Sequence, residues 1–407
     1  MTDINKTHDD TGRIQALLDK RGLVKLDEPR VYVISKTLII HSNTKFELSP
    51  GAKLLAAPYS KCALIENECF RGGGRDENIE IIGGIFDGNC DNMGLDGEHE
   101  AIHRLDDPYS PDLFKGKLMR FAHVDNIALE KLTVKDPISY GIQIADARGF
   151  LARDIRFDYN HHFGTTDGIH VNGPAYDGVI ENLYGTTNDD MVSLTTVDEP
   201  HAEVTSGEIV NVYIHNISAK NGYSGVRLLS AGGFDVRCIH INGVWGDYRH
   251  NAVLVTHHNI RPNTPVYFDD IIIEHVHASK SETPLPDHCF TYWEKEAMHA
   301  PVIWFGKGIF VGNATIRDVS RFERSKVTDA YLIRLDKGAS IERLVLENVT
   351  QRNADGINAP FIKNEATIGE LIERGVSLSV LSSTENTQSN PSSTGEIHPW
   401  WMKSLSR

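Results

Sequence analysis

The chain has 407 residues, of which 40% are hydrophobic and 24% charged, a composition typical of a globular protein rather than a disordered one. Lysine and arginine number 41 against 56 aspartates and glutamates, so the formal net charge is −15. An acidic chain of this kind lacks the basic surface that nucleic acids and anionic membranes require, and neither is an expected partner.

The N-terminal residues 1–6 lack the apolar core of a signal peptide, and no run of 18 apolar residues follows. We therefore expect a cytoplasmic protein without a membrane-spanning helix. The five cysteines are irregularly spaced and form no Cys-x-x-Cys pair. Their pattern indicates reduced thiols rather than disulfides or a zinc site.

The first predicted element is a short helix over residues 9–19. Ile14, Leu17 and Leu18 recur at the spacing of one helical face, and Gly22 follows as a stop signal. After this helix the pattern changes to short apolar runs with alternating side chains, which continue for most of the chain.

These runs recur in a fixed order. The first set comprises residues 140–144, 167–171, 190–194, 225–229, 252–255, 301–305 and 331–335. The second set lies between them and comprises residues 152–157, 179–183, 210–214, 236–241, 268–273 and 341–346. Repeats of this length with two or three short strands are typical of a solenoid, and no helices separate the strands as a βαβ fold requires. We predict an all-β, single-stranded right-handed parallel β-helix whose opening helix covers one end of the core.

The predicted domain organisation is simple. Residues 1–381 form the β-helix, with its N-terminal cap at about residues 8–22, and residues 382–407 form a polar C-terminal tail of low complexity. One longer insertion falls near residues 259–300. Self-association of the solenoid through its coil edges is left open.

Three aspartates occupy equivalent places in two successive repeats. Asp189 and Asp190 follow Asp167 by 22 and 23 residues. If Ile169 and Val171 point into the core, stacking at about 4.8 Å brings the three carboxylates to one patch. Like charges so close raise at least one pKa, and a carboxylic acid beside carboxylates is what glycoside hydrolysis needs.

The surrounding sequence resembles a known family. Residues 166–168 (Thr-Asp-Gly) and 188–190 (Asn-Asp-Asp) resemble the Asn-Thr-Asp-Gly and Asp-Asp motifs of polygalacturonase-type glycoside hydrolases, family 28. Residues 9–11 and 79–89 resemble openings of the wider pectate-lyase-like β-helix superfamily. The resemblance covers roughly residues 8–375.

That resemblance implies an inverting glycoside hydrolase that needs no cofactor and no metal. By position, Asp189 would be the general acid that protonates the leaving oxygen. Asp167 and Asp190 would hold and deprotonate the attacking water.

Two departures from the family concern the substrate. The family has a Gly-His-Gly motif in the next coil, whereas residues 221–227 contain no histidine. Its Arg-Ile-Lys motif, which holds the sugar carboxylate, has no charged counterpart in residues 251–256, which argues against galacturonan. His170 and Arg227 are candidates to replace these functions. The alternative is that Arg227 pairs with an acidic neighbour and His170 is a solvated surface side chain.

Three further side chains are candidate substrate contacts. Trp304 should point outward between two inward side chains, where an exposed indole could stack on a sugar. Gln143 and Arg334 should point outward on the same face. The alternative is that the insertion at 259–300 covers Trp304.

The sequence thus favours a glycoside hydrolase with a carbohydrate as its partner, exo-acting if the insertion walls off one end of the site. A second reading keeps the fold but changes the chemistry to a lyase, an epimerase or a fructan-type intramolecular transferase. In a lyase, the aspartates could bind calcium, so a chelator would distinguish the two. A third reading is a non-catalytic, tailspike-like carbohydrate-binding protein.

Overall fold

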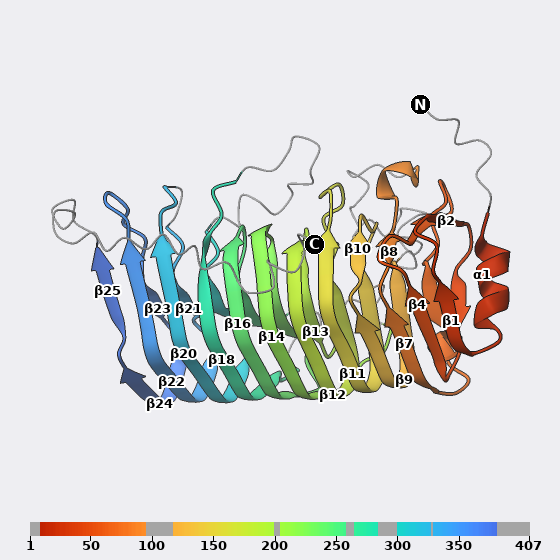
Figure 1. Ribbon diagram of the computed structural model, residues 1–407. Coiled ribbons are helices and arrows are strands. Elements are labelled where there is room, and N and C mark those ends of the chain that lie inside the picture. Colours follow the sequence, from red (N-terminus) through yellow and green to blue (C-terminus); the bar gives the residue numbers. More distant parts are fainter. Residues whose placement is uncertain are drawn as a thin grey trace.

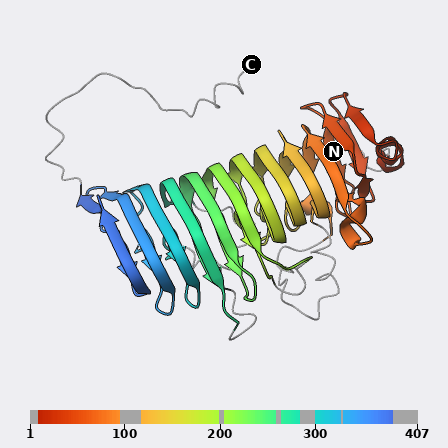
Figure 2. The same ribbon diagram turned by 90° about the horizontal axis from the view of Figure 1, so that it is seen from below.

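The computed structural model describes residues 9–94, 117–198, 204–257, 264–283, 299–326 and 329–380. The described chain winds into a solenoid, with α1 (Thr11–Leu18) at one end and β24 (Thr367–Arg374) and β25 (Ser377–Val380) at the other (Figure 1). Successive coils lie side by side along the solenoid axis (Figure 2). Their strands pair in parallel from one coil to the next, and the predicted parallel β-helix is confirmed.

Three ladders of strands form the walls of the solenoid. The first ladder contains β3 (Leu38–Ile40), β6 (Ile65–Asn67), the starts of β9 (Met119–Glu130), β11 (Ile142–Asp158) and β12 (Ile169–Thr186), then β13 (Asp190–Thr195), β15 (Ser224–Ser230), β17 (Val253–His257), β19 (Ile303–Phe305), β21 (Ile333–Leu335) and β23 (Ile362–Asn364). The second ladder contains β1 (Gly22–Leu26), β4 (Thr44–Leu48), β7 (Asp76–Ile82), the middles of β9, β11 and β12, then β14 (Ile209–Gly222), β16 (Val236–Tyr248), β18 (Tyr267–Lys280), β20 (Phe310–Glu323), β22 (Ser340–Asn353) and β24. The third ladder contains β2 (Val31–Ile34), β5 (Lys53–Ala56), β8 (Ile85–Asp87), β10 (Thr133–Lys135), the ends of the longer strands and β25. Two short 3₁₀ turns lie at Glu68–Arg71 and Cys90–Asn92.

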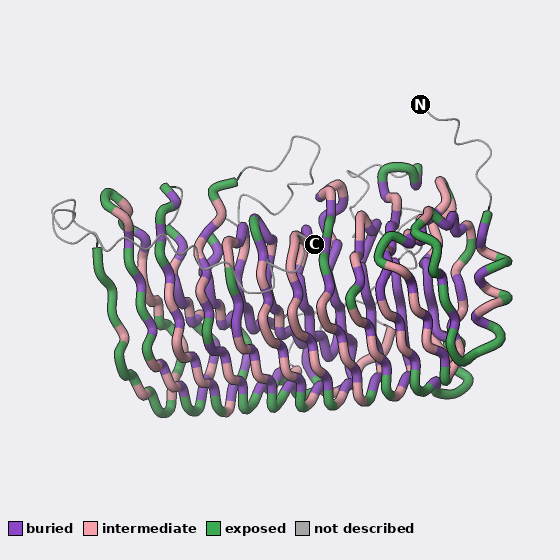
Figure 3. The backbone as a smooth tube through the Cα atoms, viewed as in Figure 1, coloured by how far each residue is buried: buried purple, intermediate pink, exposed green. Residues whose placement is uncertain are grey.

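The core is made of stacked columns of aliphatic side chains. One inward column of the first ladder consists of Ile142, Ile169, Val192, Val226, Val253, Ile303 and Ile333, all fully buried. Burial of each such side chain is worth roughly 1.5–3 kcal/mol. The buried residues run the length of the solenoid (Figure 3).

The predicted apolar runs match these ladders. The first set of runs forms consecutive strands of the first ladder. The second set lies in the second ladder, except that the run 152–157 ends in the third ladder, where Arg156 and Phe157 pair with β10. The strand β20 was not among the predicted runs. Its inward residues, Ala314 and Ile316, are separated by Thr315 in a polar stretch, so the apolar signal there is short.

Asparagine and aspartate side chains build a corner of the solenoid. Asp154, Asn182 and Asn216 each adopt a left-handed backbone conformation, with φ of 56°, 56° and 59°. Short polar side chains tolerate this conformation best. The amide of Asn182 donates to Asp154 Oδ1 at 2.9 Å, and Asn216 donates to Asn182 Oδ1 at 2.8 Å. The corner is therefore tied from coil to coil by side chains as well as by backbone.

The two ends of the solenoid differ. At the N-terminal end, Ile14 and Leu18 of α1 are fully buried against the first coils, as predicted for a cap. At the other end, Leu371, Leu378 and Val380 of the last coil are 42%, 48% and 59% exposed.

Several predictions fall outside the described residues. The predicted tail, 382–407, lies there entirely. Within the predicted insertion at 259–300, β18 is a regular strand of the second ladder, whereas residues 258–263 and 284–298 lie outside the described residues.

The described cysteines form no disulfide. Cys62, Cys69, Cys90 and Cys238 are all unbridged thiols. Among the described residues, no helix has the length and apolar character needed to cross a bilayer.

Candidate active site

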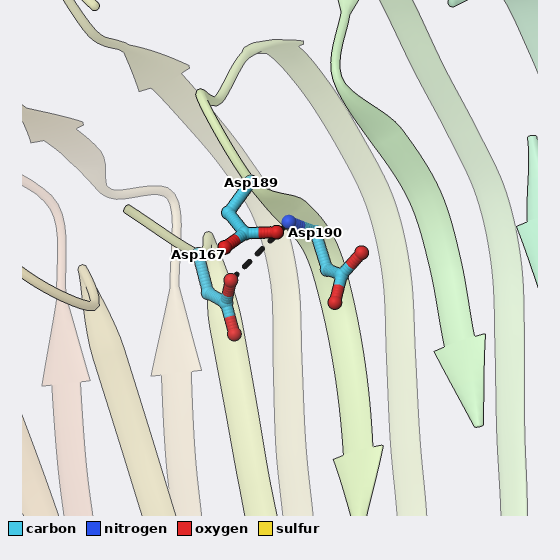
Figure 4. Close-up of side chains that lie close together, drawn as sticks. All are labelled: Asp167, Asp189 and Asp190. Carbon is cyan, nitrogen blue, oxygen red and sulfur yellow. Dashed lines mark hydrogen bonds between the residues drawn. The ribbon is translucent and has the colours of Figure 1, made fainter. Parts of the chain in front are cut away.

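The three aspartates converge where two coils of the first ladder begin. Asp167 lies two residues before β12, Asp189 immediately precedes β13, and Asp190 is its first residue. Because β12 and β13 pair in parallel, the three side chains meet, with one oxygen from each within 4.8 Å of the others (Figure 4). The backbone N–H of Asp190 donates to Asp167 Oδ1 at 3.2 Å. We call this group the acid cluster.

The acid cluster is withdrawn from solvent. Asp167 and Asp190 are 3% and 2% exposed, and Asp189 is partly buried. Burial, followed by the charges of Asp167 and Asp190, raises the pKa of Asp189 well above its usual range. Burial also raises the pKa of Asp190 to about 6, against the opposing effect of the Arg227 guanidinium. The surroundings therefore raise the pKa of Asp189 more strongly than that of its neighbour Asp190.

Arg227 reaches the acid cluster from the next coil. It lies on β15, and its Nη1 is 3.4 Å from Asp190 Oδ2. Its Nε donates to Thr256 Oγ1 at 3.4 Å. Of the two readings of Arg227 from sequence, pairing with an acidic neighbour is the contact that the structure contains.

His170 is buried rather than solvated. It is 3% exposed; its Nδ1 lies 2.6 Å from Asp167 Oδ2, and its Nε2 lies 3.2 Å from Asp198 Oδ2. The ring of Tyr140 stacks on the imidazole, with centroids 4.1 Å apart and planes 6° apart. Lys117 Nζ lies 5.0 Å from the centroid of the Tyr140 ring. Each ring nitrogen of His170 therefore faces a carboxylate, and Nε2 also lies 3.3 Å from the Asn172 amide nitrogen.

The outward residues of the first ladder form one row, as the alternation predicts. The row contains Gln143, His170, Ser193, Arg227, Leu254, Trp304 and Arg334. Gln143 is fully buried, and its Nε2 donates to Asn172 Oδ1 at 2.7 Å. It lies beside His170 in the row, one coil before it.

Trp304 and Arg334 form a separate group further along the row. Trp304 is half-buried and donates from Nε1 to Asp336 Oδ2 at 2.8 Å. The Arg334 guanidinium carbon lies 4.7 Å from the Trp304 ring centroid, and its Nε donates to Asp336 Oδ1 at 2.8 Å. We call Trp304, Arg334 and Asp336 the aromatic cluster. Buried Leu254 stands between it and Arg227 in the row.

Comparison with known proteins gives matches only at the level of structure. No known protein family matches the sequence, and none of the curated proteins matches it. A family 28 exopolygalacturonase of Yersinia enterocolitica has 14% identity and a TM-score of 0.51, over 90% of this chain and 76% of that one. A polygalacturonase of Erwinia carotovora has 13% identity and a TM-score of 0.53, over 92% and 94% of the two chains. A tailspike protein of the E. coli bacteriophage HK620 has 13% identity and a TM-score of 0.57, over 89% of this chain and 63% of that one.

The chain has the pectate-lyase-like right-handed β-helix fold. This confirms the fold expected from the resemblance to family 28. At these identities the similarity shows the fold alone, since polygalacturonases and a phage tailspike share it.

Sequence reasoning missed three residues around His170 in this β-helix. Tyr140 stands at the start of a predicted strand, and its position before Gly141 gave no chemical signal. Lys117 and Asp198 flank β9 and β13 outside any motif. Burial lowers the pKa of Lys117 to about 7, in spite of the charges of Asp198 and Asp167. Only the winding of the β-helix brings these residues together.

A histidine also lies close to Asp190, on the coil that follows β15. Ser224 pairs with Asp190 in register and is hydrogen bonded to it. Ser224 Oγ lies 3.2 Å from His250 Nδ1. Burial, then the charge of Lys280, lowers the pKa of His250 well below its usual range, so the ring is neutral. Residues 221–227 contain no histidine, but His250 lies near this stretch in space, next to Ser224.

The acid cluster is the group of described residues close enough to share a cation, with one oxygen from each aspartate. Donors already engage it. Both oxygens of Asp167 accept hydrogen bonds, from His170 and from the Asp190 backbone, and Arg227 faces Asp190. These contacts fit proton transfer better than a metal site, because each donor occupies a direction that a cation would need.

Proposed function

We propose that this chain is a glycoside hydrolase that cleaves an oligosaccharide or polysaccharide at the acid cluster. One observation carries the proposal. Two coils bring one oxygen from each of three carboxyl groups within 4.8 Å, and their surroundings raise the pKa of Asp189 well above its usual range and that of Asp190 only to about 6. Carboxyl groups whose pKa values are driven apart in one site are typical of an acid and base pair.

The roles follow from the protonation states. Burial and the neighbouring carboxylates raise the pKa of Asp189 most, so Asp189 is the carboxyl group of the cluster that keeps its proton as pH rises and serves as the general acid for the leaving oxygen. Asp190 is mostly ionised at neutral pH and, with Asp167, orients and deprotonates the attacking water. Arg227 keeps Asp190 available as a base because it lowers the pKa that burial raises.

The stereochemical outcome needs its own measurement. The resemblance to family 28 implies inversion. However, one oxygen from each aspartate lies within 4.8 Å of the others, whereas carboxyl groups of inverting enzymes are generally about 6.5–9.5 Å apart. Proton NMR of the first-formed anomer distinguishes inversion from retention.

The structural relatives support a carbohydrate substrate. Two are polygalacturonases by name, and the HK620 tailspike is known in complex with a pentasaccharide. We propose a substrate other than galacturonan, because Arg227 contacts Asp190 and Arg334 contacts Asp336. Exo action, which the Yersinia relative has by name, is part of the proposal, and a product time course that releases random internal fragments contradicts it.

A lyase is the second candidate, and Lys117 is the residue proposed as its base. Lys117 is buried near the acid cluster, and its pKa of about 7 leaves a neutral amine available. Such an amine could abstract the proton next to a uronate carboxylate.

Incubation in ¹⁸O-labelled water separates the candidates. Wild-type protein and Asp189→Asn would be given neutral and acidic oligosaccharides, and products weighed by mass spectrometry. Hydrolysis adds one labelled oxygen, and Asp189→Asn abolishes it. Unlabelled products with an unsaturated sugar identify a lyase, and loss of that activity in Lys117→Gln assigns the base. An absence of products across a broad panel supports a binding protein.

A further inference from the structure

The strongest unassigned feature is the buried chain of charges behind the acid cluster. His170 lies between two carboxylates, at 2.6 Å from Asp167 and 3.2 Å from Asp198. An imidazole can donate from both nitrogens only when it is protonated. His170, Asp167 and Asp198 are 3%, 3% and 6% exposed, so water does not screen these contacts.

The surroundings hold the imidazole in this position. Tyr140 stacks flat on the ring at 4.1 Å, and its hydroxyl donates to Asp198 Oδ2 at 3.5 Å. Tyr140 is itself 6% exposed, and Lys117 lies by the Tyr140 ring. The ring therefore has little freedom to turn away from Asp167.

Charged groups from three other coils, and the neutral phenol of Tyr140 from a fourth, face this site. Lys117 precedes β9, Tyr140 precedes β11, Asp198 follows β13, and Arg227 lies on β15. His170 itself is on β12, and the acid cluster stands beside it. Burial lowers the pKa of His170, but hydrogen bonds and charges from Asp167 and Asp198 raise it to about 9. The imidazole is therefore a cation at neutral pH.

This cation acts on Asp167 and not on Asp189. Asp167 Oδ2 accepts a hydrogen bond from His170 Nδ1, and Asp167 Oδ1 accepts one from the backbone N–H of Asp190. Both oxygens of Asp167 are therefore turned toward donors rather than toward Asp189. The negative charge of Asp167 is in turn the first neighbouring charge that raises the pKa of Asp189.

We propose that His170, held by Asp198, decides which aspartate of the acid cluster carries the proton. It fixes Asp167 as a carboxylate and leaves the proton on Asp189. His170 is thus a positioning residue, because its two nitrogens already contact Asp167, Asp198 and the Asn172 amide rather than substrate. The inference deepens the proposed function and rests on it only where Asp189 is used as the general acid.

The test follows the proton directly and needs no substrate. Protein labelled with ¹³C at aspartate carboxyl groups is titrated by NMR, and the signals are assigned by their loss in Asp167→Asn and Asp189→Asn. In wild type, the proton should reside on Asp189 rather than on Asp167. In His170→Gln, the Asp189 signal should titrate at lower pH, because the two carboxyl groups then share the proton.

Asp198→Asn is the milder variant, because it leaves the imidazole in place. In this variant the pKa of His170 should fall by about one unit, as read from ¹⁵N-histidine shifts, because one of its two carboxylate partners has lost its charge. The Asp189 signal should then titrate at lower pH than in wild type. The matched control is His240→Gln, which removes another histidine paired with a carboxylate, Glu274 at 2.7 Å, on the second ladder. It should leave both aspartate titrations unchanged.

Activity gives the second readout once a substrate is known. His170→Gln should lower kcat by roughly 10²-fold with little change in KM. Asp198→Asn should move the alkaline limb of the pH profile downward, because activity that needs the imidazolium is lost as pH rises through its pKa. Unchanged aspartate titrations in His170→Gln and Asp198→Asn overturn the inference. If the titrations shift but no glycoside is hydrolysed, the proton placement stands and the proposed function fails.

Discussion

The acid cluster and the aromatic cluster lie along the same ladder, but they differ in how their carboxylate charges are compensated. In the aromatic cluster, a single carboxylate, Asp336, accepts hydrogen bonds from Trp304 and Arg334, so its charge is matched. In the acid cluster, three carboxyl groups crowd together, and the pKa of Asp189 rises well above its usual range.

The strands cannot cause this difference, because parallel strands in register carry both clusters. The difference comes from which side chains the coils present. Matched charges such as those around Asp336 hold a surface in place. Buried like charges cost stability, and groups of this kind concentrate at sites of proton transfer.

The largest expected effect is the loss of the general acid. Asp189→Asn should lower kcat by roughly 10³-fold, since proton donation by a placed acid contributes about 10²–10⁴-fold. The matched change in the aromatic cluster, Asp336→Asn, should lower kcat less than about tenfold. Steady-state kinetics checks both, and circular dichroism confirms folding. If Asp189→Asn keeps most of its activity, the assignment of the acid is wrong.

The next effect is on pH dependence, where Arg227 sharpens the comparison. Asp190 has a pKa of about 6 and must be ionised to act as a base, so activity should fall as pH drops below about 6. Arg227 lowers that pKa, so Arg227→Gln should move the acidic limb upward by about one pH unit. Arg334→Gln, the equivalent change in the aromatic cluster, should leave the limb in place. A limb that stays at the same pH in Arg227→Gln removes Asp190 from the role of base.

Much of this site could be predicted because it is encoded locally. Asp167, Asp189 and Asp190 sit at fixed offsets from apolar runs, and a ladder in register turns equal offsets into neighbours in space. The outward row, from Gln143 to Arg334, followed from the same alternation.

The partners of these side chains could not be predicted in the same way. Asp198 and Lys117 lie outside the strands, and Asp336 follows one, so no alternation fixes where they point. His170 was expected either to contact substrate or to be solvated. The sequence of its own strand does not show that His170 is buried among charged side chains from three other coils. Contacts between coils depend on how the loops return, and the sequence pattern does not encode this.

A smaller effect is expected on substrate affinity at the aromatic cluster. If a sugar stacks on Trp304, Trp304→Ala should raise KM by about fivefold, which corresponds to roughly 1 kcal/mol, with kcat little changed. Trp304→Phe, which keeps a flat ring, should recover part of the loss. A change confined to kcat, or no change at all, would show that Trp304 serves only to hold Arg334 and Asp336.

The smallest expected effect is on stability, and it should have opposite signs in the two clusters. The pKa of Asp189 is raised in the folded state, so its stabilising contribution is present below the unfolded pKa of about 3.8 and is lost as pH rises. Asparagine is neutral at every pH, so a variant with asparagine at this position does not lose this stability as pH rises. Relative to wild type, Asp189→Asn should therefore gain about 2 °C in Tm between pH 4 and pH 8.

Asp336→Asn provides the opposite case in the same calorimetric series. It weakens hydrogen bonds to a charged partner, Arg334, and to the indole of Trp304, so its Tm at pH 8 should fall by about 1–2 °C. Equal and same-signed shifts in the two variants would mean that the acid cluster does not hold its carboxyl groups against their mutual repulsion. Opposite signs would show that the acid cluster costs the folded chain stability at neutral pH, as expected of charges kept together for chemistry.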